Sequence, residues 1–112
     1  MLTARDIVYL SGPMTGHPGL NRDEFYRAAE AIEERYGCNV INPANLEFLM
    51  GEGRKYEHLM EVDLALVRTS TALVSMPEPI RFSTGALRER AQARECGIKI
   101  LQLEEVLPSW GA

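Results

Sequence analysis

Short apolar runs alternate along the chain with longer segments in which apolar residues recur at helical spacing. The short runs are typical of buried strands, and the longer segments are typical of amphipathic helices. The predicted strands are residues 6–10, 40–41, 71–76 and 98–101. The predicted helices are residues 21–36, 56–67 and 83–96, with a further helical turn at 104–107.

The first predicted helix carries boundary signals at both ends. Asn21 stands where an N-cap belongs, and Glu24 follows three residues later, as in a capping box. Gly37 stands where a left-handed residue would end the helix. The apolar face between these signals consists of Phe25, Ala28, Ala29, Ile32 and Tyr36.

The alternation of strands with helices predicts an α/β fold. We expect a doubly wound, Rossmann- or flavodoxin-like parallel sheet of four to five strands, in the order 2-1-3-4(-5), with helices on both faces. Residues 1–112 are expected to form a single domain. The Gly- and Pro-rich loops 11–20 and 77–82 follow the first and third strands. Because these strands flank the switch point of the sheet, the two loops are expected to meet where open α/β sheets bind ligands.

The start of the helix after the third strand is the strongest candidate for chemistry. Ser83 stands at its N-cap position, and the free N–H groups of a helix start favour an anion. Glu89 follows about one and a half turns into the helix. A carboxylate beside such a helix start predicts a reaction centre. The alternative is that Ser83 serves only as the N-cap of the helix.

Two further side chains have both a structural and a functional interpretation. Tyr9 ends the first strand, either as a core residue or as a phenol that positions a carboxylate. Asp63 interrupts the apolar face of a helix, so it is either paired at the surface, for example with Arg68, or used as a ligand contact or acid. Residues 11–16 could surround a ligand with backbone N–H groups, although they match neither the Walker loop nor the dinucleotide fingerprint.

Charge and composition limit which partners, cofactors and cellular locations we expect for this protein. The net charge of −4 disfavours a nucleic-acid polymer as partner. Cys38 and Cys96 form no ligand cluster and are expected to be buried free thiols, which suits a reducing compartment. His17 and His58 lack ligand spacing, so neither a metal nor another cofactor is expected. The apolar run 7–10 is too short for a signal peptide or a membrane span, so we expect a cytoplasmic protein without membrane contact.

Four short motifs occur in order along residues 7–101. They are YLSGPM at 9–14, NPA at 42–44, DL at 63–64 and SxGAxxE at 83–89. Together they resemble the nucleoside 2-deoxyribosyltransferase superfamily, and most closely its short branch common in phages and prophages. Related phage proteins often carry tryptophan three residues before the serine, where this chain has Ile80, so recognition of the base is expected to differ.

The resemblance implies a mechanism and a site. In the superfamily, the glutamate that matches Glu89 attacks C1′ of a (deoxy)ribosyl ring and forms a covalent glycosyl ester. The tyrosine that matches Tyr9 orients this glutamate. The aspartate that matches Asp63 assists with the base or its proton. Relatives with serine at the position of Ser83 hydrolyse nucleoside 5′-monophosphates, whereas true nucleoside transferases have aspartate there. The residues expected to bind substrate are Ser11, Gly12, Pro13, Met14, Asn42, Ser83 and Gly85.

Three functions therefore remain open at this stage. The first is cleavage of the N-glycosidic bond of a nucleoside 5′-monophosphate, or transfer of its (deoxy)ribosyl group. A related enzyme alternative has an NAD-like dinucleotide as substrate, because it also contains an N-glycosidic bond. The second is a nucleotide-binding or sensing module without catalysis, and the third is an interaction protein that has kept only the fold. The resemblance also implies a homodimer or higher homo-oligomer, and the candidate contact residues in this chain are Tyr56, Leu59, Met60 and Trp110.

Overall fold

A computed structural model of the chain describes residues 1–13, 21–45, 56–77 and 84–111. Its centre is a four-stranded sheet of β1 (Ile7–Ser11), β2 (Asn39–Ile41), β3 (Ala72–Ser75) and β4 (Lys99–Gln102), in the order β2-β1-β3-β4. Every neighbouring pair of strands is parallel. The predicted doubly wound α/β fold and its strand order are therefore confirmed.

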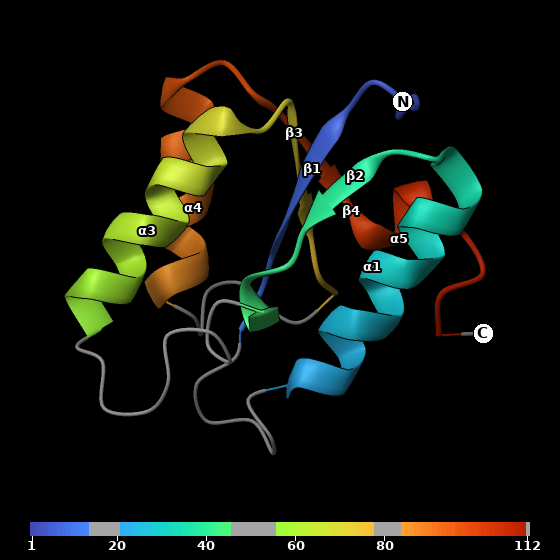
Figure 1. Ribbon diagram of the computed structural model, residues 1–112, viewed down its shortest axis with the longest axis horizontal. Helices are drawn as coiled ribbons and strands as arrows, with labels where there is room; N and C mark the ends of the chain where they lie inside the picture. Colours follow the sequence, from blue (N-terminus) through green and yellow to red (C-terminus); the bar gives the residue numbers. More distant parts are fainter. Residues whose placement is uncertain (14–20, 46–55, 78–83, 112) are drawn as a thin grey trace.

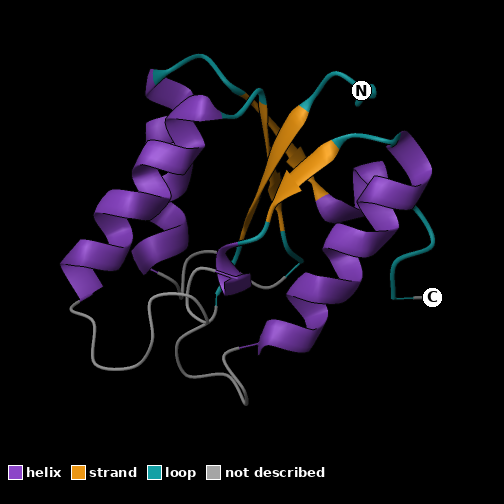
Figure 2. Ribbon diagram, in the orientation of Figure 1, coloured by secondary structure: helices purple, strands orange, loops and turns teal. Residues whose placement is uncertain are grey.

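Helices cover both faces of this sheet (Figures 1 and 2). On one face lie α3 (Tyr56–Thr69) and α4 (Thr84–Glu95). On the other lie α1 (Arg22–Tyr36) and α5 (Leu103–Val106). The predicted helices are present, and α3 continues two residues beyond its predicted end at Val67. No helix among the described segments is long and apolar enough to span a membrane.

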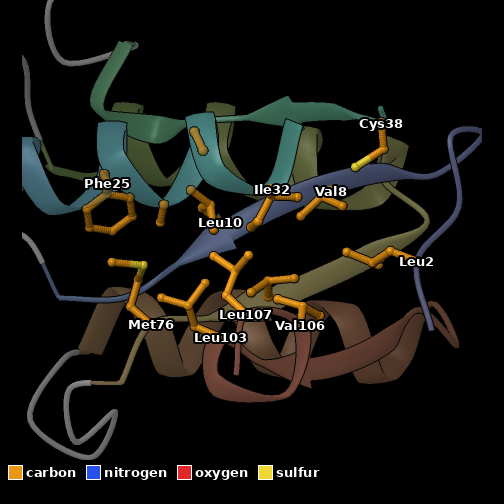
Figure 3. Packing of buried hydrophobic residues seen from close by; sticks show 14 of the residues in the cluster. Leu2, Val8, Leu10, Phe25, Ile32, Cys38, Met76, Leu103, Val106 and Leu107 are labelled. Atoms are coloured by element: carbon orange, nitrogen blue, oxygen red, sulfur yellow. The ribbon is translucent and has the colours of Figure 1, made fainter. Parts of the chain in front are cut away.

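Alternation along β1 divides its side chains between two apolar clusters. Val8 and Leu10 pack with α1 and α5, as Figure 3 shows for Phe25 and Ile32 of α1. Tyr9 belongs to the smaller cluster, beneath α3 and α4. Because successive residues of a strand point to opposite faces, Ser11 lies on the same face as Tyr9.

Gly37 and Asn21 flank α1 as predicted, but Asn21 lacks the side-chain bond of a capping box. Gly37 adopts φ 68° and donates its N–H to Glu33 O at 2.9 Å. Asn21 has φ 60° and makes no side-chain capping bond. Its Nδ2 donates to Pro13 O at 3.2 Å, so the asparagine joins the helix start to the segment after β1. The capping-box prediction at Asn21 and Glu24 was wrong because asparagine tolerates the left-handed region and found a tertiary partner.

The two cysteines differ in environment. Cys38 is a buried free thiol, as predicted, and burial raises its pKa. Cys96 is also free but exposed, so the prediction that it is buried was wrong. It lies just beyond the last residue of α4, in a turn that passes through Gly97 with φ 70°, where the helical face no longer determines burial.

Asp6 links the amino ends of three strands through hydrogen bonds and an ion pair. Its carboxylate accepts hydrogen bonds from the Thr3 N–H at 2.8 Å and the Thr71 hydroxyl at 2.7 Å, and it pairs with Lys99 at 3.4 Å. Burial acts to raise the pKa of Asp6, but these bonds outweigh it and hold the pKa below 3.8. The ionised carboxylate therefore joins the starts of β1, β3 and β4.

The carboxyl ends of β1 and β3 approach each other closely at Gly12. The Met76 N–H donates to Ser11 O at 2.7 Å, and a Cβ placed on Gly12 would lie 2.7 Å from Met76 Cβ. Glycine is needed here because any larger residue would push the two strand ends apart.

We therefore expect Gly12→Ala to lower the free energy of unfolding by about 1–3 kcal/mol, through overpacking against Met76. Urea denaturation measures this as a lower midpoint with an unchanged slope. An unchanged midpoint would show that the strand ends can separate at no cost.

Candidate active site

Three polar side chains meet within the core, beneath α4. The Tyr9 hydroxyl donates to Glu89 Oε2 at 2.6 Å, and the Ser11 hydroxyl donates to Glu89 Oε1 at 2.7 Å. Tyr9 and Ser11 are fully buried, and Glu89 is 5% exposed. Each oxygen of one carboxyl group therefore has its own hydroxyl donor.

The positions of these side chains follow from local structure. Tyr9 and Ser11 are two residues apart on β1, so both face α4. On α4, the buried residues are Ala86, Glu89 and Ala93, which share one helical face. The two alanines leave room for the helix to lie near the sheet, and Glu89 occupies the space between them. A glutamate on the core-facing stripe of a helix is uncommon and needs specific partners.

Asp63 of α3 brings a second carboxylate to the same place. Its charge and its hydrogen bonds raise the pKa values of both Tyr9 and Glu89, so it lies beside the two of them. Arg68, one predicted surface partner of Asp63, donates to Gln92 Oε1 at 3.3 Å. The structure thus brings together the three residues for which catalytic roles were predicted: Tyr9, Asp63 and Glu89.

Burial dominates the electrostatics of this cluster. It raises the pKa of Glu89 to about 8, against the opposing effect of the hydrogen bonds from Tyr9 and Ser11 and with a further increase from Asp63. Burial and the neighbouring carboxylates also raise the pKa of Tyr9 well above 10. At neutral pH, Glu89 is therefore mostly protonated in the ligand-free protein, and Tyr9 remains a hydrogen-bond donor.

Some of the predicted substrate-binding residues lie near this cluster along the chain. Gly12 and Pro13 directly follow Ser11, and Gly85 is in the first turn of α4. A Cβ on Gly85 would be 3.4 Å from Met60 Sδ and 3.5 Å from the Tyr56 hydroxyl, so α3 covers this turn closely. Met14 and Ser83, together with Ile80 and His17, lie outside the described residues, and their predicted roles stay predictions.

Asn42 follows β2 and is buried. Its Oδ1 accepts a hydrogen bond from the Ala44 N–H at 3.0 Å. Its Nδ2 is buried and has no hydrogen-bond partner among the residues described. Its predicted contact with substrate stays a prediction.

Two features were missed by sequence reasoning. The bond from Ser11 to Glu89 was not foreseen, because Ser11 was considered only as part of a ligand-binding loop. An ion pair between Arg88 and Glu57, at 2.9 Å, links α4 to α3 beside the site, and Arg88 lies 5.8 Å from the centre of the Tyr56 ring. No local signal in the sequence indicates a pair so far apart along the chain.

The described histidine and the candidate subunit-contact residues lie on or near α3 and the C-terminal segment. In the described segments, no group of three or more His, Cys, Asp or Glu side chains could hold a metal ion. His58 is exposed on α3. Met60 is buried within the chain, and Trp110 packs against the larger apolar cluster, with Arg27 5.1 Å from its ring centre. Tyr56 is exposed.

Comparisons with known proteins identify a family, and those with solved structures identify the fold. A family model described as "Domain of unknown function (DUF4406)" matches residues 6–102. Curated proteins gave no match. Among solved structures, the chain is similar to a 2-desoxiribosyltransferase from Leishmania mexicana and to a 2-deoxyribosyltransferase from Bacillus psychrosaccharolyticus, each with a TM-score of 0.66 and 17% identity. The matches cover 87% and 86% of this chain, which spans 63% and 70% of those proteins. The chain therefore has a nucleoside 2-deoxyribosyltransferase-like fold.

The raised pKa of Glu89 predicts a pH-dependent stability. Below the ordinary value of 4.5 the carboxyl is neutral in both the folded and the unfolded chain; between 4.5 and about 8 only the unfolded chain ionises readily. The stabilisation by the protonated form is thus lost as pH rises toward 8. Relative to Glu89→Gln, the wild-type free energy of unfolding should fall by on the order of 4 kcal/mol over this range.

Urea denaturation at several pH values between about 5 and 9 tests this prediction. The exposed Glu95→Gln, at the end of the same helix, is the matched control and should follow the wild type at each pH. A wild type and Glu89→Gln that differ by the same amount at every pH would contradict the raised pKa.

Proposed function

The chain belongs to the DUF4406 family, and we propose that it cleaves the N-glycosidic bond of a nucleoside 5′-monophosphate or transfers its (deoxy)ribosyl group. The observation that carries this proposal is the carboxyl of Glu89, buried and held by hydroxyl donors on both of its oxygens. It lies beside the carboxyl ends of β1 and β3, at the switch point where sheets of this type bind ligands.

In the proposed reaction, ionised Glu89 attacks C1′ of the sugar. A bond forms between a carboxylate oxygen and C1′, and the bond from C1′ to the base nitrogen breaks. The electron pair goes to the base, which takes up a proton. Water or a second base then attacks C1′ and releases Glu89, so the configuration is retained after two inversions.

The environment of Glu89 suits this chemistry. A nearby positive charge stabilises a buried carboxylate strongly, and the sugar becomes cation-like in the transition state. Tyr9, with its raised pKa, stays protonated and keeps the carboxylate oriented. Asp63 is the second acidic group beside Glu89 and is assigned to the proton that the leaving base requires.

The preference for a phosphorylated substrate rests on the start of α4. Its first turn contains no acidic residue, so nothing there repels a phosphate. Ser83, in place of the aspartate of nucleoside transferases, supports the same choice. We assign Gly12, Pro13, Met14, Asn42, Ser83, Gly85 and the backbone of Ser11 to substrate binding.

One observation favours a second candidate, a nucleotide-binding or sensing module without turnover. Glu89 has a pKa of about 8 in the ligand-free protein, so the neutral form, which is a poor nucleophile, predominates at pH 7. Catalysis requires that the bound ligand favour ionisation, whereas a sensor would have no such need.

Incubation with ribo- and deoxyribonucleoside 5′-monophosphates, with chromatographic detection of free base, tests the enzyme proposal. We expect base release that Glu89→Ala lowers by about a thousandfold or more, since the nucleophile is lost. Tyr9→Phe should lower it by about 10- to 100-fold, the worth of one hydrogen bond to a charged group. Glu95→Gln is the control and should leave the rate unchanged.

Base release that persists at the wild-type rate in Glu89→Ala would refute the role of Glu89. Nucleotide binding measured by calorimetry, with no product after long incubation, would favour the binding module.

A further inference from the structure

Ser11 is the less obvious of the two donors to Glu89. It ends β1, it is fully buried, and its hydroxyl lies 2.7 Å from Glu89 Oε1. The resemblance of the chain assigns it only to a loop around the substrate. A side chain without solvent exposure that is already bonded to a carboxyl oxygen points to a different role.

The geometry of β1 explains why two donors reach one carboxyl group. Tyr9 and Ser11 project from the same face of the strand, one pleat apart. Tyr9 lies deeper and its long side chain reaches Oε2, whereas Ser11 lies at the strand end and its short side chain reaches Oε1. The last torsion of a glutamate side chain is soft, so a single donor would leave the carboxylate plane free to rotate. Donors on both oxygens fix that plane.

We propose that Ser11 is a positioning residue: with Tyr9 it clamps both oxygens of Glu89, and so holds the carboxylate ready for attack on the sugar. This inference rests on the function proposed above. Ser11 exchanges no proton with the substrate and remains a neutral donor throughout the reaction.

The charged and titratable groups around Glu89 give the clamp a measurable consequence. Tyr9 faces it from β1 and Asp63 from α3, while Ala72–Ser75 of β3 contain no ionisable side chain. On α4 itself, Arg88 is paired with Glu57. Burial and Asp63 raise the pKa of Glu89, and the bonds from Tyr9 and Ser11 lower it. Removing the Ser11 hydroxyl should therefore make Glu89 harder to ionise.

Ser75 offers a matched control. It is the register partner of Ser11 on β3, and it is also buried. Its hydroxyl donates to Met76 O at 3.4 Å and has no bond to Glu89 in the described structure. Ser75→Ala thus removes an equivalent buried hydroxyl from the same end of the sheet without touching the clamp.

The experiment is a carbon-13 NMR titration of the Glu89 carboxyl in the wild type, Ser11→Ala, Ser11→Cys and Ser75→Ala. We expect Ser11→Ala to raise the pKa of Glu89 by about one to two units, because a hydrogen bond to the charged form is lost. Ser11→Cys, whose thiol is a weaker donor, should shift it less, and Ser75→Ala should match the wild type. Ser11→Ala that titrates like the wild type, or equal shifts in Ser11→Ala and Ser75→Ala, would overturn the inference.

Kinetics supply an independent measure. In Ser11→Ala, the acidic limb of the kcat/KM profile, which reports the free enzyme, should move up by the same shift of about one to two units. At pH 7, kcat/KM should fall about 10- to 100-fold, with little change in KM. A fall in affinity alone, with an unmoved pH profile, would overturn the positioning role. If the wild type releases no base, the proposed function fails, and the titration still decides whether Ser11 clamps Glu89.

Discussion

The burial of one carboxyl group, that of Glu89, is the constraint on which the site depends. Removing an ionisable group from water is costly, and the fold offsets this with a hydroxyl on each oxygen. The two hydrogen bonds do not fully offset the cost of burial, because the pKa of Glu89 remains at about 8. The carboxylate is therefore a high-energy state in the folded protein, and a cation-like sugar is the kind of partner that would stabilise it.

The order of the strands makes this arrangement possible. Glu89 is 80 residues from Tyr9 and 78 from Ser11, so no local interaction joins them. Because β1 and β3 are neighbours in the parallel sheet, the helix that follows β3 lies over the end of β1. The α3 helix packs beside α4 on the same face and adds Asp63. Donors, carboxyl and second acid thus come from three elements that the topology brings to one place.

Much of the fold could be predicted from the sequence because apolar periodicity determines which elements form, and the rules for parallel sheets determine their order. The nearness of Tyr9 and Glu89 followed from the switch point. Side-chain partners were harder to predict. Asn21 is the N-cap residue of α1, as expected, but its side chain bonds Pro13 and forms no capping box. Cys96 was expected to be buried but is exposed. The bond from Ser11 was missed because the direction of a hydroxyl at a strand end depends on the helix packed above it.

Trapping the glycosyl-enzyme ester would test the proposed reaction at its first step. The protein would be incubated with a nucleoside 5′-monophosphate analogue whose ester hydrolyses slowly, then examined by intact-mass measurement and peptide mapping. We expect a mass increase equal to one glycosyl phosphate, located on Glu89. Base release with no adduct, or an adduct on any other residue, would contradict it.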